Sequence, residues 1–226
     1  CEDNRSLIRN ACWVDNEPGF YPLLCGMGAS TLAFIPLRYA LFTEGITDLI
    51  LLPTLLRKAT ARDHLGFQIV PGLSSADDNK LTLLHRQAPR TAYLLDSDRG
   101  GNKLYKRLIN AGISEDRIFR LPDYRKQGLV IEDFVDPQLF TQAVNEEINK
   151  WQNSKFKIVG GNLPEVNRPQ YVSILCKENN LKPITKRSLA YTIIELSNGN
   201  DVVWKKRKES LSKLYYQIAT ALGIKL

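Results

Sequence analysis

The chain has 226 residues, of which 43% are hydrophobic and 24% charged, and its formal net charge is +7. This length and hydrophobic content suffice for a substantial core, near the size at which one domain acquires a second lobe. Charged residues such as Arg38, Glu44 and Asp48 interrupt the best candidate for a membrane span, so we expect a soluble, cytoplasmic protein with no membrane association. Four cysteines without a Cys-x-x-Cys pair, and only two histidines, argue against a zinc site.

Prolines and glycines break up any period in residues 1–37, which we expect to be a connector or the end of a preceding domain. Residues 26–31 have the glycines and hydroxyls of a phosphate loop but lack its lysine, and no clear strand precedes them. We therefore assign no nucleotide site there. The chain starts at Cys1 and its only methionine is Met27, so we expect a fragment or a processed piece.

Strands and helices are expected to alternate from residue 38 onward. The expected strands are Arg38–Thr43, Phe67–Val70, Thr91–Leu95 and Arg117–Leu121. The expected helices between them are Asp48–Arg62, with Pro53 bending or delaying it, Ala76–Gln87 and Asn102–Ala111. Alternation at this spacing predicts an α/β fold with a parallel sheet flanked by helices on both faces.

The rest of the chain is expected to be helical. Pro137 suits the first position of a helix that continues to about Trp151. Three more helices are expected near Pro169–Asn179, Thr185–Ser197 and Val203–Leu222. We therefore predict an α/β domain over residues 38–150 and a C-terminal helical lobe over residues 151–226.

Three apolar runs in the predicted α/β domain end in carboxylates. The pairs that follow them are Glu44 and Asp48, Asp96 and Asp98, and Glu132 and Asp133. Open parallel sheets place their sites at the carboxyl ends of strands, so these acids would converge at one edge. Hard cations prefer oxygen ligands, and crowded carboxylates are tolerable only when a cation neutralises them. The pattern therefore predicts a site for divalent cations.

The same residues carry a resemblance. Glu44-Gly45-Ile46-Thr47-Asp48, followed by Leu94-Leu95-Asp96-Ser97-Asp98, resembles the Toprim signature shared by bacterial primases, type IA and type II topoisomerases and a group of nucleases. Within that group, Ile131-Glu132-Asp133 and the threonine after Gly-Ile resemble the OLD (overcoming lysogenization defect) family nucleases. The resemblance covers roughly residues 38–140 well and the remainder weakly.

The resemblance implies a Toprim catalytic domain that nicks or cleaves DNA by a two-metal mechanism, with two Mg²⁺ or Mn²⁺ ions. Glu44, Asp96 and Asp98 would be catalytic and bind one ion. Asp48 and Glu132 would hold the second, and Asp133 would belong to the second shell or cap the next segment. Lys186, within Thr185–Ala190, is similar in place to an active-site lysine of OLD-family nucleases and would stabilise charge on the phosphate.

The resemblance also implies partners. Longer OLD-family members join an ABC-type ATPase to a C-terminal Toprim half, so an ATPase domain would precede residue 1 or act in trans. A homo-oligomer would form through that domain. Many proteins of the family look like antiphage (antiviral) defence components, sometimes associated with other members of a defence system.

Positive charge is concentrated in the predicted helical lobe. Residues 151–226 carry 13 Lys and Arg against 5 Asp and Glu, whereas residues 1–150 carry 18 against 19. The residues expected to bind DNA are Lys182, Arg187, Lys205, Lys206, Arg207 and Lys208. The alternative for Lys205–Lys208 is a solvated helix face.

Two other functions stay open. A Toprim primase or topoisomerase would use the same acidic edge, but nothing marks the nucleophilic tyrosine of a topoisomerase or the template-binding region of a primase. The chain could also be a catalytically silent nucleic-acid-binding module of a larger assembly. Cleavage products distinguish the enzymes, and binding of manganese separates all of them from a silent module.

Overall fold

The computed structural model describes residues 39–76, 81, 90–122, 128–152, 156–159, 161, 163–198 and 201–225. Tyr39–Leu226 form one compact unit. The expectations for residues 1–37, and nearly all of the predicted helix Ala76–Gln87, lie outside the described residues. Among the helices that are described, none is long and apolar enough to cross a membrane.

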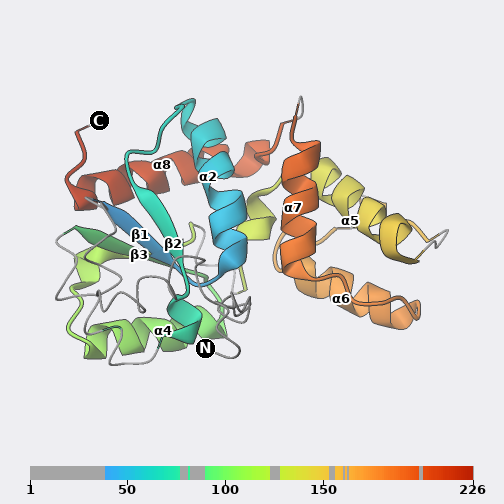
Figure 1. Ribbon diagram of the computed structural model, residues 1–226, viewed down its shortest axis with the longest axis horizontal. Coiled ribbons are helices and arrows are strands. Elements are labelled where there is room, and N and C mark those ends of the chain that lie inside the picture. The colour runs from blue at the N-terminus through green and yellow to red at the C-terminus, as the bar shows by residue number, and fades with distance from the viewer. Residues whose placement is uncertain are drawn as a thin grey trace, which may run out of the picture. The chain divides into compact units, whose positions relative to one another are not determined.

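A parallel sheet lies at the centre of the α/β part (Figure 1). In the described residues it has the strand order β2-β1-β3-β4. The strands are β1 (Ala40–Thr43), β2 (Gln68–Pro71), β3 (Thr91–Leu95) and β4 (Ile118–Arg120). Each neighbouring pair is parallel, and every residue of β1 and β3 is buried. The α/β class is thus confirmed, with predicted strand ends shifted by at most two residues.

Helices cover both faces of this sheet. The described helices are α2 (Ile46–Thr60), α4 (Arg99–Asn110), α5 (Pro137–Gln152), α6 (Arg168–Glu178), α7 (Lys186–Leu196) and α8 (Lys205–Leu222). Figure 1 shows the sheet between α8 and α4, and α2 contacts both α7 and α8. α5 begins at Pro137 as predicted, and α2 continues through Pro53 rather than starting after it.

One core joins the sheet to the C-terminal helices. Buried side chains from β1, α2, α5, α7 and α8 form a single hydrophobic cluster. Its members include Leu41, Leu55, Phe140, Ile193 and Ile218, each fully shielded from solvent. Burial of this kind stabilises the fold by about 25 cal/mol for each Å² of apolar surface removed from water. The division at residue 150 into two domains stays a prediction.

The third predicted acidic strand end is wrong. Residues Ile131–Phe134 form a 3-10 helix, η4, because the Asp133 carboxylate accepts a hydrogen bond of 3.0 Å from the N–H of Val130 and closes a turn. This turn still lies beside the end of β3. The N–H of Ser97 donates to the carbonyl of Leu129, and the N–H of Gly128 donates to the carbonyl of Ser97, both at 3.1 Å.

Candidate active site

Glu44 lies between β1 and α2, and its carboxylate joins two strand ends. Thr43 pairs with Leu94 across β1 and β3, so the residues after these strands leave the sheet at the same edge. Oε1 of Glu44 accepts a hydrogen bond of 2.9 Å from the N–H of Asp96. Burial raises the pKa of Glu44, and the negative charge of Asp98 raises it further. This edge brings the first two predicted acids together.

Asp48 is buried in the first turn of α2, where its Oδ2 accepts a hydrogen bond of 2.9 Å from the N–H of Gly45. That bond fixes the carboxylate at the helix start. Burial, followed by the charges of Glu132 and Glu44, raises the pKa of Asp48 to about 7, against the Gly45 bond and the charge of Lys186. Asp48 therefore faces the same acids that sequence reasoning grouped with it.

Asp96 follows β3 and lies near the carboxylates of Glu44, Asp48 and Glu132. These four side chains are called the acidic group below. Burial raises its pKa well above the usual range, and the negative charges of Asp48, Glu44 and Glu132 raise it further. The positive charge of Lys186 lowers the pKa of Asp96 and so opposes this shift. Four carboxylates from separate parts of the chain are thus close enough for each to disfavour the ionisation of Asp96 or of a neighbour.

Asp98 lies beside this group and caps α4. Its Oδ1 accepts a hydrogen bond of 2.8 Å from the N–H of Gly101. A Cβ at Gly101 would lie 2.1 Å from the carbonyl oxygen of Asp96 and 3.0 Å from Oε1 of Glu44, so only glycine permits this approach. Sequence reasoning gave Gly101 no role. The available signal was the pair Gly100-Gly101 directly after a strand-end acid.

Glu132 projects from η4 with 1% of its surface exposed. Within the described part of the chain, its buried Oε1 has no hydrogen-bond partner. The Lys186 Nζ lies 3.9 Å from that oxygen, which is an ion-pair distance but not a hydrogen bond. Burial raises the pKa of Glu132, and Lys186 opposes the shift.

Lys186 reaches the acids from the first turn of α7. That turn is capped by Thr185, whose Oγ1 accepts a hydrogen bond of 3.1 Å from the N–H of Ser188. Burial lowers the pKa of Lys186, but the surrounding carboxylates, with Glu132 first and Asp96 next, raise it overall. The ammonium group is therefore held in its charged form opposite the acidic group.

The predicted site residues Glu44, Asp48, Asp96, Glu132 and Lys186 thus converge, with Asp98 at their side. In their present positions, no three Asp, Glu, His or Cys side chains of the described residues form a ready coordination group for a metal ion. The donor set is nonetheless all carboxylate oxygen, the ligand type that Mg²⁺ and Mn²⁺ prefer.

Asp133 is fully buried and works as a cap. Its two oxygens accept hydrogen bonds from the N–H groups of Val130, Asn167 and Arg168, at 3.0, 2.8 and 3.0 Å. Sequence reasoning left open whether Asp133 supports a metal ligand or caps the next segment. The structure shows the cap, which ties η4 to the start of α6.

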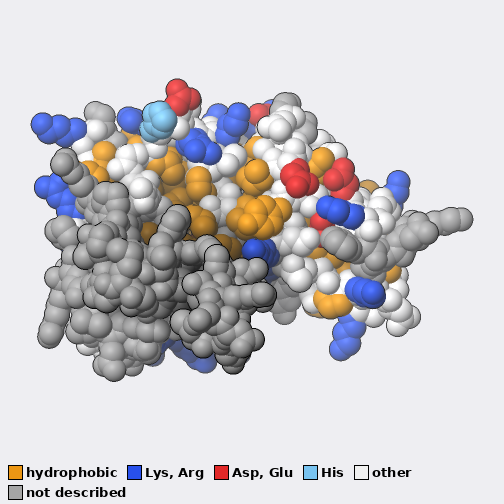
Figure 2. All heavy atoms as spheres, viewed as in Figure 1, with side chains coloured by type: hydrophobic (Ala, Val, Ile, Leu, Met, Phe, Trp, Pro, Cys, Tyr) orange, Lys and Arg blue, Asp and Glu red, His pale blue; other side chains and the backbone are white. Residues whose placement is uncertain are grey.

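The predicted DNA-binding residues fall into two groups. Lys182, Arg187, Lys205, Lys206 and Lys208 are exposed, and Lys206 pairs with Glu165. Figure 2 shows Lys and Arg side chains spread over the visible face rather than gathered in one patch.

The prediction that Arg207 binds DNA needs correction, because Arg207 is buried. Its Nη2 donates a hydrogen bond of 2.8 Å to the carbonyl of Glu165, and its guanidinium lies over the rings of Phe134 and Trp204. The helical period places it on the same face of α8 as Leu211 and Leu214, which are also buried. It holds α8 in place and is not available to a phosphate backbone.

No protein-family model matches this chain, and no curated protein matches it. Two solved structures do, both of the C-terminal region of the OLD protein of Xanthomonas campestris pv. campestris, phased with iodine and with mercury. Each is 14% identical and covers 84% of this chain. They are covered over 98% and 95% of their own lengths, with TM-scores of 0.38 and 0.36. Likenesses this weak establish neither the fold nor the chemistry of this chain.

Proposed function

We propose that this chain is a metal-dependent DNA endonuclease of the Toprim type, resembling the nuclease half of OLD-family proteins. The observation that carries the proposal is the convergence of Glu44, Asp48, Asp96 and Glu132 opposite Lys186. Buried acids that repel one another destabilise the fold unless something offsets their charge. When the four carboxylates are ionised, one lysine leaves the group with excess negative charge, so without a cation some of them hold protons instead.

Divalent cations fit this donor set. Oε1 of Glu132 is a buried acceptor without a hydrogen-bond donor among the described residues. Glu44 and Asp98 each use one oxygen to accept a backbone N–H, which leaves the second oxygen of each carboxylate for an ion. Coordination would require the carboxylates to draw together from their present positions. When bound, such ions would supply charge stabilisation for phosphodiester hydrolysis.

The chain's own residues would divide the work. Glu44, Asp96 and Asp98 would hold one Mg²⁺ or Mn²⁺, and Asp48 and Glu132 would hold a second. The backbone bonds to Glu44 and Asp48 would keep these two carboxylates oriented before any ion arrives. This preorganisation reduces the cost of binding a small cation that demands regular geometry.

Lys186 would act on the substrate. Its stem is long and flexible, and its ammonium group is held in the charged form at the edge of the acidic group. A phosphate placed against the acids would carry negative charge that increases during displacement, and a nearby cation favours that state. Lys186 would therefore stabilise the transition state, while the acids hold the metal ions.

DNA would be held by exposed cations outside the site. Lys182, Arg187, Lys205 and Lys208 are exposed and could contact phosphates without reading sequence. An ABC-type ATPase, on the same polypeptide or as a separate partner, would accompany the nuclease and mediate oligomerisation. The assembly would serve in cytoplasmic antiphage defence.

Cleavage of supercoiled plasmid DNA in Mg²⁺ or Mn²⁺ tests the proposal. Glu44→Ala and Asp96→Ala should abolish cleavage while the circular dichroism spectrum stays that of the wild type. Asp116→Ala, which removes an exposed acid, is the matched control and should cleave normally. Nicked or linear products support a nuclease, whereas relaxed circles or short primers would support the other Toprim enzymes. Full activity in both site variants would overturn the proposal.

A further inference from the structure

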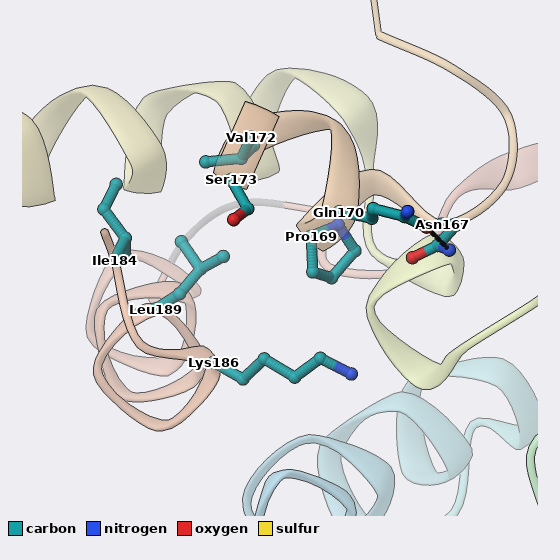
Figure 3. Close-up of a pocket in the computed structure, with 8 residues that line it drawn as sticks. All are labelled: Asn167, Pro169, Gln170, Val172, Ser173, Ile184, Lys186 and Leu189. Atoms are coloured by element: carbon teal, nitrogen blue, oxygen red, sulfur yellow. Dashed lines mark hydrogen bonds between the residues drawn. The ribbon is translucent and has the colours of Figure 1, made fainter. Parts of the chain in front are cut away.

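A pocket of about 280 Å³ lies between α6 and α7, next to the acidic group. Its floor consists of the buried side chains of Val172 and Leu189. Figure 3 shows the Ser173 and Leu189 side chains projecting into the space between these helices, and the Lys186 side chain running along its edge. The volume is just below the usual range for drug-sized ligands, so it suits one ring system rather than a longer ligand.

Lys186 connects this pocket to the acidic group. It lines the pocket, and its Nζ lies 3.9 Å from Oε1 of Glu132. The backbone gives a second link, because Asp133, the residue after Glu132 on η4, accepts the N–H of Asn167, which lines the same pocket. A ligand with its phosphate at the acids and Lys186 would therefore have its next chemical group at the pocket mouth.

The lining favours a flat group with polar edges. The walls contributed by Pro169 and Ile184 are aliphatic, whereas the rim carries the amides of Asn167 and Gln170. Nδ2 of Asn167 donates a hydrogen bond of 2.5 Å to Oε1 of Gln170. That bond does not use the amide oxygen of Asn167 or the amide nitrogen of Gln170, which offer one acceptor atom and one donor nitrogen. Such amide pairs match the edges of nucleobases.

We infer that this pocket receives one unpaired nucleobase of the DNA strand, next to the phosphate that is cut. This inference rests on the proposed nuclease function and specifies its substrate. A base within a duplex cannot enter without leaving the stack, which costs free energy. The preferred substrate is therefore DNA that is single-stranded at the point of cleavage.

The test measures binding in EDTA, so that no strand is cut. The probes are a short oligothymidylate and a strand of equal length in which every base is replaced by an abasic residue. The wild-type chain should bind the base-bearing strand about tenfold more tightly, as expected for burial of one base. It should also bind that strand more tightly than a blunt duplex of the same length.

Ser173→Phe should fill the pocket from an exposed position and remove the preference for bases without weakening binding of the abasic strand. Ile174→Phe is the matched control, because Ile174 is 48% exposed on the same helix and lies outside the pocket lining. It should leave the preference intact. Gln170→Ala removes an exposed amide without adding volume and should reduce the preference severalfold, which keeps the test valid if Ser173→Phe misfolds.

An unchanged preference in both Ser173→Phe and Gln170→Ala would overturn the inference. A second result would also overturn the inference. If thymidine 5′-monophosphate binds the wild type but not Ser173→Phe, while the wild type binds both strands equally, the pocket is an effector site. The nuclease proposal fails through a different result, which is normal plasmid cleavage by Glu44→Ala. That result does not alter a base preference measured in EDTA.

Discussion

Glu132 and Asp133 are neighbours in sequence and are both buried, yet they lie in regions with opposite electrostatics. Asp133, at the junction of η4 and α6, accepts three backbone N–H groups. Burial raises its pKa, but every other influence, including the charge of Arg168, lowers it. Glu132 faces other carboxylates, and its Oε1 accepts no hydrogen bond from the described residues. The fold thus supplies backbone donors to Asp133 and none to Oε1 of Glu132 among the described residues.

The buried cation at the junction of η4 and α6, Arg168, also has its partners there. Arg168 is buried, and its Nη1 and Nε donate hydrogen bonds of 2.7 and 3.1 Å to the carbonyls of Val135 and Pro164. Its guanidinium also lies 4.8 Å from the centre of the Trp204 ring. The difference between the regions teaches that burial alone does not mark a functional acid. A candidate functional acid is one that combines burial with like-charged neighbours and missing donors.

The largest expected effect distinguishes substitution of Asp133 from substitution of Glu132. Asp133→Ala should lower the free energy of unfolding by about 3–5 kcal/mol, because it removes the acceptor of three buried N–H groups and the negative charge that faces the buried Arg168. Glu132→Gln should change the same free energy by less than about 1 kcal/mol, since it removes a repelled charge and keeps the shape. Urea unfolding without divalent ions measures both. Equal losses would show that Glu132 is as structural as Asp133.

The next effect concerns the cation that faces the acids. Lys186→Ala should reduce the rate of DNA cleavage roughly 100- to 1,000-fold, the usual loss when one group that stabilises transition-state charge is removed. Its thermal stability should stay close to that of the wild type. Lys213→Ala is the control, because Lys213 is exposed and pairs with Glu209 along α8. Comparable activity in the two variants would remove Lys186 from the mechanism.

The pH dependence of stability sharpens the comparison further. The pKa of Asp48 is about 7 in the folded chain against an ordinary 3.8, so the folded state holds its proton more tightly. The stabilisation is complete below pH 3.8 and is lost as pH rises through 7. Stability in EDTA should therefore fall between about pH 4 and pH 7, by a few kcal/mol for this group, because one pKa unit corresponds to about 1.4 kcal/mol. Asp48→Asn should weaken that fall, and an unchanged pH profile would contradict the assignment.

The smallest effect separates exposed from buried basic residues of α8. Lys205→Ala should weaken binding to all DNA sequences equally and lower the slope of log affinity against log salt by about 1. Arg207→Ala should instead destabilise the fold, because its guanidinium packs between Phe134 and Trp204. Binding titrations at several salt concentrations, beside urea unfolding, distinguish the two. A reduced salt slope for folded Arg207→Ala would show that Arg207 contacts the phosphate backbone of DNA after all.

Much of the fold was predictable because local rules agreed with the tertiary structure. Thr91–Leu95 is a strand over the predicted residues, and Pro137 begins α5 because proline suits a first helical position. Convergence of Glu44 and Asp96 was predictable because neighbouring parallel strands end at one edge.

The rest depended on contacts far apart in the sequence. Sequence alone could not separate Glu132 from Asp133, because the partners Asn167 and Arg168 lie more than thirty residues away. Nor could it place Arg207, since a run of four basic residues is typical of a surface whereas the helical period buries one of them.

Calorimetric titration with Mn²⁺ tests the central claim most directly. Because burial and mutual repulsion raise the pKa values of Asp48 and Asp96, ion binding should release protons, which appears as a heat that depends on the buffer. The wild type should bind Mn²⁺ with this proton release, and Asp96→Asn should bind far more weakly. Equal binding by the two proteins, or no binding by the wild type, would contradict a cation site at this edge of the sheet.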